Sequence, residues 1–314
     1  AKLGLSKDIP VSQFPAKLVL ELRSLTRKYY DLTDERSAHI NKLKGDLHTV
    51  FPQYLDVFCD VTGKTSTMIL RQYGTPDKIL RGHKKTMIEK ISKASRKGLA
   101  KASERYEKLC AAANAAKTFG CQIDSIYFNI FLTLDLVEKL DSALDSILNR
   151  IRQLITFNKN EKFIQQIKLL NTIPGVGFLT AVTIMCEIGD FSAFRNPKQL
   201  FAYFGLDPEV NESGKFVGTQ LHMSKRGSRI ARRAIFAVAL ASIRTKRNGE
   251  GINPYLRKYY ELKSGQKPKM VAIGAVMHKV CNIVFAVLRD EKAFELRSPE
   301  EHCKQYQRPA LAAA

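Results

Sequence analysis

Three short stretches between residues 169 and 233 hold residues whose types and spacing suit the binding or chemistry of a phosphate group. The first is IPGVG at residues 173–177, which lies between two segments with apolar residues at helical spacing. Its glycines, Gly175 and Gly177, let a short turn expose consecutive backbone N–H groups, and the next helix adds its positive N-terminal end. This pattern is typical of a helix-hairpin-helix, which binds a nucleic-acid backbone without reading bases. A tight turn between two packed helices is the alternative interpretation.

The second stretch, NESGK at residues 211–215, places the hydroxyl group of Ser213 directly before a glycine. Glycine lets another backbone, such as a phosphodiester, approach closely. A serine nucleophile needs an adjacent base or a strong electrophilic field. Its neighbours Glu212, Lys215 and His222 are not placed for this task by spacing alone. The residues by themselves therefore leave two interpretations open, a nucleophile and an ordinary surface turn, to which Ser-Gly is prone.

The third stretch, HMSKRGSRIARR at residues 222–233, combines basic residues with the start of a predicted helix. Ser228 suits the N-cap, and Ile230, Ala234, Ala237 and Ala241 repeat on one face. Cations near a helix start suit phosphate oxygens, which guanidinium and free amide groups bind together. A solvated basic face is the alternative, but the two neighbouring stretches favour binding. The nucleic-acid contacts predicted in the three stretches are Gly175, Gly177, Gly214, Lys215, Ser224, Lys225, Arg226, Arg229, Arg232 and Arg233.

The order of four motifs along the chain carries a family resemblance. IPGVG, GDFSAFRNPKQLFAYFGLDP, ESGK and MSKRGSRIARRAIFAVA together resemble the C-terminal transposase domain of the insertion-sequence 110/1111 family, which also contains the pilin-gene invertase. The similarity covers about residues 168–290, and the ordered combination is specific where each motif alone is weak. The resemblance implies a DNA transposase or site-specific recombinase, guided at least in some members by a structured RNA. It also implies that Ser213, from the family's Ser-Gly pair, is the catalytic nucleophile.

Members of this family resemble one another in a further domain, a ribonuclease H-like nuclease domain with a DEDD set of carboxylates. A stretch similar to the one that begins at Ala1 follows those carboxylates in the family, so we expect them, and the Mg2+ they would bind, to lie upstream. No metal ligands are expected in the 314 residues, and the isolated chain should bind DNA but barely react. The rival hypothesis is a non-catalytic binder of branched DNA or structured RNA that uses the hairpin and the basic helices as a clamp.

Charge supports a nucleic-acid partner. The chain has 51 Lys and Arg residues against 30 Asp and Glu, a net charge of +21, which points to a polyanion. We find no run of about 18 apolar residues that would predict a membrane span and no signal peptide, so we expect a cytoplasmic protein associated with the prokaryotic nucleoid. Six cysteines without CxxC or CxxxH spacing give no support to metal-finger or redox functions.

The N-terminal half is predicted to be helical. A long amphipathic helix runs from Leu18 to Val50 and ends near Phe51-Pro52. Residues 79–109 are strongly basic yet carry apolar residues at helical spacing. So much like charge favours a segment that lies along a nucleic-acid backbone, with a solvated helix face as the alternative. The contacts predicted there are Lys93, Arg96 and Lys97.

Apolar residues from Val137 to Leu154 alternate by three and four positions, as in the a/d positions of a coiled coil. This helix pairs either with the 18–50 helix of the same chain or with a second copy. The family resemblance favours the second copy, hence a homo-oligomer such as a dimer or tetramer, because a site composed from different protomers is expected there. We predict an all-α protein with a helical linker containing basic helices and coiled coil at 1–167, a compact transposase domain at 168–295 and a tail at 296–314.

Overall fold

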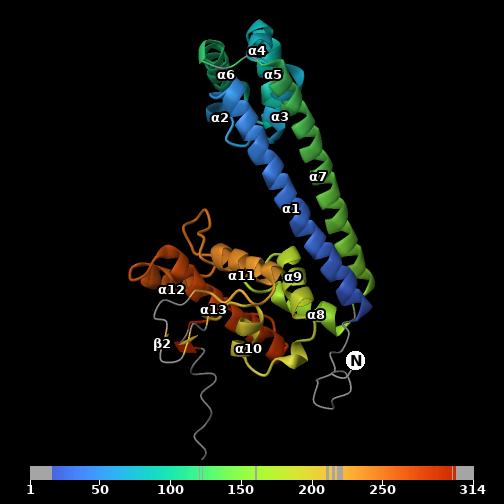
Figure 1. Cartoon of the computed structure of the whole chain (residues 1–314), viewed down its shortest axis with the longest axis vertical. Helices are drawn as coiled ribbons and strands as arrows, with labels where there is room; N and C mark the ends of the chain where they lie inside the picture. Colours follow the sequence, from blue (N-terminus) through green and yellow to red (C-terminus); the bar gives the residue numbers. More distant parts are fainter. Residues whose placement is uncertain are drawn as a thin grey trace, which may run out of the picture. The chain divides into compact units, whose positions relative to one another are not determined.

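The computed structural model describes residues 16–119, 121, 123–159, 161–209, 212–213, 216–217, 222–298 and 300–301. This part of the chain is helical apart from two strands of two residues each, which confirms the predicted all-α class (Figure 1). Two compact units are present. The first combines Ala1–Lys28 with Leu148–Ala314, and the second is Tyr29–Ile147. The boundary expected between residues 167 and 168 lies inside the first unit.

Two long helices, α1 (Lys17–Val50) and α7 (Asp124–Phe157), contribute residues to each unit. The second unit also contains α2 (Tyr54–Val57), α3 (Lys64–Gln72), α4 (Pro76–Arg81), α5 (Lys84–Ser95) and α6 (Leu99–Phe119). The predicted end of α1 before Phe51-Pro52 is confirmed. At the next predicted break, the Thr75 side chain accepts a hydrogen bond from the Lys78 N–H and Pro76 occupies the first turn of α4.

Side chains from α1 to α7 form the core of the second unit. Leu43 and Leu47 of α1 are buried together with Phe51, Tyr54 and Leu109. The Tyr54 hydroxyl group donates a hydrogen bond to the Ser66 carbonyl at 3.0 Å. Within this unit, the core therefore joins the long helices to the shorter ones between them.

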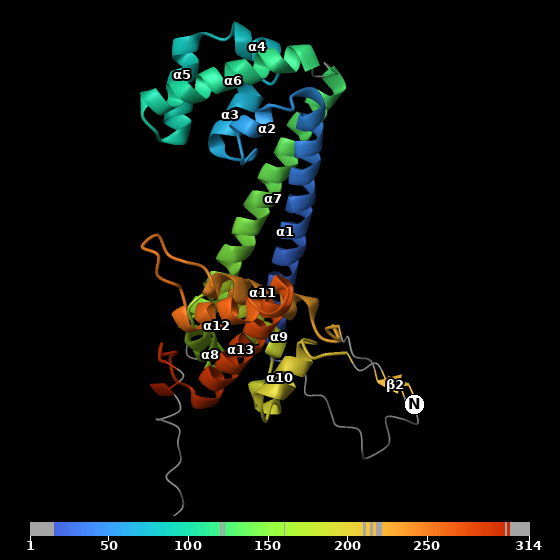
Figure 2. The same cartoon turned by 90° about the vertical axis from the view of Figure 1, so that its left-hand side faces the viewer.

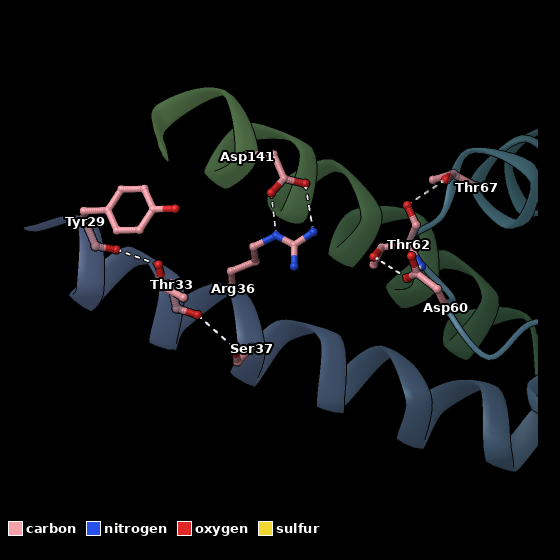
Figure 3. Close-up of polar contacts among 8 residues, drawn as sticks. All are labelled: Tyr29, Thr33, Arg36, Ser37, Asp60, Thr62, Thr67 and Asp141. Atoms are coloured by element: carbon pink, nitrogen blue, oxygen red, sulfur yellow. Dashed lines mark hydrogen bonds and ion pairs between the residues drawn. The ribbon is translucent and has the colours of Figure 1, made fainter. Parts of the chain in front are cut away.

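In the second unit, the apolar side chains of α7 that predicted a coiled coil are buried by other residues of the same chain. Val137 and Leu144 are 3% and 8% exposed. The Arg36 guanidinium group of α1 forms an ion pair with both carboxylate oxygens of Asp141 on α7 (Figure 3). Pairing with the 18–50 helix is thus the interpretation that the described residues support in this unit. Self-association through α7 stays a prediction.

The first unit holds most of the predicted site. Its further elements are α8 (Lys162–Leu170), α9 (Phe178–Ile188), η2 (Phe191–Ala193), α10 (Pro197–Tyr203), β1 (Glu212–Ser213), β2 (Phe216–Val217), α11 (Arg229–Ser242), α12 (Pro254–Ser264) and α13 (Lys269–Asp290). The predicted N-cap at Ser228 is confirmed, since its side chain accepts a hydrogen bond from the Ala231 N–H. Asn196 and Asn253 cap α10 and α12 in the same way, each before a proline.

The apolar face predicted for α11 is partly wrong. Ile230 and Ala234 are buried, but Ala237 is exposed and Ala241 is half-buried. The buried stripe continues instead through Val238. Ile230 lies at one edge of the buried face, which also includes Ala231, Ile235 and Ala239 and faces α9 and α13, so Ala237 and Ala241 lie at or beyond that edge.

Helix α13 contributes most to the core of the first unit and contacts α8, α10, α11 and α12. Among the described residues, it is the one helix that is long and apolar enough to cross a membrane by length and composition. The sequence had predicted no such segment. Of its most apolar window, 56% is buried inside the protein. Packing against the four helices therefore accounts for the apolar composition of α13.

Candidate nucleic-acid interface

The turn that contains Gly175 joins α8 to α9 and packs against the end of α11. Gly175 has φ +93°, and a Cβ atom there would lie 2.7 Å from the Ser242 Oγ atom. The Ser242 hydroxyl group donates a hydrogen bond of 3.0 Å to the Pro174 carbonyl. Only glycine accepts both the left-handed backbone and this close approach. The geometry of the turn thus depends on a residue almost seventy positions away.

Gly177 differs from Gly175, because it is exposed and has ordinary negative φ. It is the N-cap of α9 and makes no side-chain capping hydrogen bond. A Cβ atom at this position would meet no heavy atom within 4 Å. The first turn of α9 is therefore open to an approaching phosphate, as a helix-hairpin-helix requires. The helix-hairpin-helix itself stays a prediction.

Sequence reasoning missed one cation beside this turn. The Arg152 guanidinium group, from the last part of α7, lies over the ring of Phe178, 6.0 Å from its centroid. Phe178 is the first residue of α9, and Arg152 is exposed. Its position adds positive charge to the start of α9. In the sequence, Arg152 was visible only as a charged residue beside the apolar positions of α7.

Ser213 belongs to a hairpin between α10 and α11. Its base is an antiparallel ladder with hydrogen bonds from Lys225 N to Gly205 O (3.0 Å), Ser224 N to Asp207 O (2.8 Å) and Glu209 N to His222 O (2.7 Å). Farther along, β1 and β2 pair Glu212 with Val217 and Ser213 with Phe216. Ser213 thus lies on a strand rather than on the predicted loop. Gly214 and Lys215 lie outside the described residues.

The basic loop, defined here as residues 224–229, packs tightly on the end of α10. A Cβ atom on Gly227 would lie 2.0 Å from the Tyr203 carbonyl oxygen, and one on Gly205 would lie 2.4 Å from the Gly227 nitrogen. Two backbones therefore touch here with no room for a side chain between them. This contact brings the basic loop and the base of the Ser213 hairpin together.

Two predicted contact residues hold this loop in place. The Arg232 guanidinium group donates hydrogen bonds to the carbonyls of Phe204 (3.2 Å), Lys225 (3.2 Å) and Gly227 (2.7 Å). The Ser224 hydroxyl group donates to a carboxylate oxygen of Asp207 at 2.6 Å. Arg232 and Ser224 thus have structural contacts within the protein, and their binding of nucleic acid stays a prediction.

Other predicted cations of this region face solvent. Lys225, Arg226 and Arg229 are exposed, whereas Arg233 is half-buried. Lys225 adopts φ 54°, a left-handed conformation that turns the chain toward α11. The exposed side chains gather at the N-terminus of α11, where the helix dipole also attracts anions. The structure therefore brings together the basic loop and the start of α11, as predicted.

A buried carboxylate, which sequence reasoning missed, supports the same helix start. Glu187 is 3% exposed and receives two hydrogen bonds of 2.9 Å each from Arg27. Burial alone would raise the pKa of Glu187, but hydrogen bonds from Arg27 and Ser228 and the charges of Arg27 and Arg23 lower it below its ordinary value. The ionised carboxylate thus connects α1 to α9.

Lys93, Arg96 and Lys97 are exposed where α5 ends and lie in the second unit. Arg96 has φ 53°, and the Ser92 hydroxyl group donates to the Lys97 carbonyl at 2.7 Å. Other cations of the basic segment lie over aromatic rings of the same unit, namely Lys84 over Tyr106, Lys90 over Tyr73 and Arg105 over Phe58. The predicted basic surface is therefore helical, and its nucleic-acid contacts stay predictions.

The described residues do not fit a magnesium site. No group of three or more His, Cys, Asp or Glu side chains that could hold a metal ion occurs among them. Hard divalent cations such as Mg2+ prefer carboxylate oxygens.

Comparison with known proteins agrees with these features. Residues 167–261 match the model described as the transposase IS116/IS110/IS902 family. The chain is 23% identical to an uncharacterized protein of insertion element IS110 from Streptomyces coelicolor, over 90% of this chain and 66% of that relative. It is 30% identical to a pilin gene-inverting protein of Moraxella bovis, over 56% of this chain and 52% of the relative.

A third relative is the transposase for insertion sequence element IS1111A of Coxiella burnetii, 26% identical over 58% of this chain and 50% of the relative. The chain spans between about half and two thirds of the length of these three relatives. The matched family region contains the Gly175 turn, the Ser213 hairpin and the basic loop. Residues 167–261 of the chain therefore resemble the IS116/IS110/IS902 family of transposases.

Proposed function

We propose that this protein is a transposase or site-specific recombinase of an insertion sequence, that it acts on DNA, and that Ser213 is its nucleophile. One observation carries the proposal. The hairpin that holds Ser213 and the basic loop share one antiparallel base, so the backbone links Ser213 directly to a group of exposed cations. The names of the relatives support the same class of reaction, since they are a transposase and a gene-inverting protein.

The reaction proposed for Ser213 is transesterification. Its hydroxyl oxygen attacks a DNA phosphorus atom and forms an ester bond, the bond from phosphorus to one sugar oxygen breaks, and that oxygen leaves as a strand hydroxyl. The proton lost by the serine balances the proton gained by the leaving oxygen. A hydroxyl group of another strand then displaces the serine by the reverse exchange. No external energy source is required, because each step exchanges one phosphate ester bond for another.

Positive charge must surround the phosphate during this exchange, because negative charge spreads over its oxygens in the transition state. Lys225 and Arg226 are exposed cations at the base of the Ser213 hairpin. Lys215 and Arg233 were predicted for the same task, Lys215 from its place beside Ser213 in the sequence. We assign charge neutralisation to this group. The open start of α9 is assigned to a second phosphate of the same strand.

Three further parts of the proposal come from the family resemblance. We place Mg2+ on DEDD carboxylates that are not among these residues, where it would stabilise negative charge on phosphate oxygens. We also propose guidance by a structured RNA and a homo-oligomeric assembly. The basic segment with Lys93, Arg96 and Lys97 is proposed separately, from its charge, to contact a nucleic-acid backbone. The protein would then act at the nucleoid in the cytoplasm. The high net charge of +21 supports a nucleic-acid partner for the chain.

The competing function is a clamp that binds branched DNA or structured RNA without chemistry. The exposed cations and the open start of α9 suit such a clamp equally well. Salt-sensitive binding is expected from both functions and cannot separate them. Dependence of strand exchange on Ser213 does separate them.

The test incubates the full-length protein with element DNA, its nucleic-acid partners and Mg2+, then examines it by denaturing gel and mass spectrometry. We expect DNA covalently attached to the peptide that contains Ser213. Ser213→Ala should abolish both the adduct and strand exchange while it keeps DNA affinity within about twofold, because the lost hydroxyl bears no charge. Ser264→Ala, at the end of α12, is the matched control and should behave like the unmodified protein. Strand exchange that persists in Ser213→Ala would refute the nucleophile.

A further inference from the structure

A second hairpin, distinct from that of Ser213, connects α11 to α12. We define it as the basic hairpin, residues 244–252. Its hydrogen bonds run from Lys246 N to Glu250 O (2.7 Å), from Gly249 N to Lys246 O (3.0 Å) and from Ile252 N to Arg244 O (2.9 Å). An antiparallel bridge joins Thr245 to Gly251. The segment leaves the helices as a projecting loop between α11 and α12 (Figure 2).

The local sequence explains why the chain turns here. Gly249 has φ +85°, which glycine adopts without strain, and it follows an asparagine. The side-chain oxygen of Asn248 accepts a hydrogen bond of 3.2 Å from the Glu250 N–H. Asn-Gly is a strong short-range predictor of a hairpin. The basic hairpin is therefore an ordered turn with its own hydrogen bonds.

The base of the basic hairpin is attached to the turn at Pro174 through one serine. The Ser242 carbonyl accepts a hydrogen bond of 3.0 Å from the N–H of Asn253, which is 2% exposed. The Ser242 hydroxyl group binds the Pro174 carbonyl at 3.0 Å. Arg257 adds a bond of 3.2 Å to the Ile243 carbonyl. The basic hairpin thus starts two residues after Ser242, which makes the contact that holds the α8–α9 turn.

Charge on the basic hairpin is strongly one-sided. Arg244, Lys246 and Arg247 are exposed cations, and Glu250 is the single acidic residue of the segment. Lys246 lies 3.6 Å from Glu250, an exposed ion pair. Within the described ranges, no hydrogen bond or ion pair engages the guanidinium groups of Arg244 and Arg247. Two unpaired cations held on a protruding turn are stabilised by an external anion.

We propose that the basic hairpin inserts into a groove of duplex DNA, with Arg244, Lys246 and Arg247 on the flanking phosphates. This inference rests on the proposed DNA-binding function and extends it to a surface outside the predicted site. A two-stranded ribbon has dimensions that the major groove admits. The exposed residues 244–250 include no large apolar side chain, which a protein partner or a membrane surface would require. Phosphate contacts position a protein without reading sequence, so the binding is not sequence-specific.

The test measures the affinity of the full chain for a short duplex of mixed sequence by fluorescence anisotropy over a series of salt concentrations. The variant is Lys246→Gln with Arg247→Gln. Each phosphate contact contributes about 0.9 to the slope of log affinity against log salt concentration, so the slope should fall by roughly 2. The matched control is Lys267→Gln with Lys269→Gln, which removes the same charge from exposed positions before and at the start of α13 in the same unit. In this control, the slope of log affinity against log salt concentration should fall by less than half the decrease expected for the Lys246→Gln, Arg247→Gln variant.

A second arm repeats the titration with one strand of the same duplex. If the basic hairpin inserts into a groove, the substitutions should reduce the salt slope more for the duplex than for the single strand. The proposal would be overturned if the salt slope fell equally for the duplex and the single strand. It would also be overturned if the slope fell equally in the basic-hairpin variant and in the control variant. An unchanged duplex slope in a variant that keeps its circular dichroism spectrum would do the same. Failure of the unmodified chain to bind duplex DNA would instead refute the underlying DNA-binding function.

Discussion

Arg27, near the beginning of the described chain, binds Glu187 at the end of α9 through two parallel hydrogen bonds of 2.9 Å each. The two residues are 160 positions apart. The Ser228 side chain, at the N-cap of α11, also contributes to lowering the pKa of Glu187. The Arg27–Glu187 ion pair therefore joins the N-terminal part of α1 to the end of α9.

Substitution of Glu187 by glutamine should destabilise the first unit. The amide group keeps the shape of the side chain but cannot accept both guanidinium hydrogen bonds. We expect a loss of about 1–2 kcal/mol in the free energy of unfolding, because Arg27 is half exposed and water replaces part of the lost interaction. Urea denaturation measures the change. Glu104→Gln, which alters a fully exposed ion pair with Lys108, is the matched control and should leave stability unchanged.

The contribution of Glu187 should also depend on pH. Its folded pKa lies below the ordinary value of 4.5, so the stabilisation is present above about pH 4.5 and is lost as the pH falls through the folded pKa. The stability difference between the unmodified protein and Glu187→Gln should therefore be constant at neutral pH and shrink in acid. A difference that grows in acid would contradict the lowered pKa.

Gly175→Ala and Gly177→Ala test the two glycines of the α8–α9 turn separately. A methyl group at Gly175 would meet Ser242 at 2.7 Å with φ +93°, so we expect a loss of about 1–3 kcal/mol in stability. Gly177→Ala adds a methyl group in open space and should cost only a few tenths of a kcal/mol. Thermal unfolding compares them. Equal losses in the two variants would contradict the packing of Gly175 on α11.

Arg232→Gln and Arg229→Gln separate structural support from binding. Arg232 donates hydrogen bonds to three carbonyls, so its loss should lower stability by about 1–3 kcal/mol. Arg229 is exposed, and its loss should leave stability unchanged. If Arg229 binds a phosphate, its removal should lower the salt slope of DNA affinity by about 1. A stability loss from Arg229→Gln, or none from Arg232→Gln, would contradict these assignments.

Much of the helical architecture follows from the sequence because helix ends depend on neighbouring residues. Ser228 precedes an apolar repeat and caps α11, and Pro52 follows the end of α1. The order of the motifs also indicated the transposase family. The basic hairpin was predictable in the same way, since Asn248-Gly249 is a local turn signal, although it was overlooked.

The placement of side chains required the tertiary structure. Gly175 appeared in the sequence as a glycine of a phosphate-binding turn, and the fold shows that it packs against Ser242. Arg232 appeared as one cation among several, and the fold assigns it three carbonyl partners. The sequence alone determined where helices start and end and which motifs occur, because those depend on adjacent residues. Only the tertiary structure decided which cations are engaged and which are exposed, because distant segments such as Arg27 and Glu187 meet only in the folded chain.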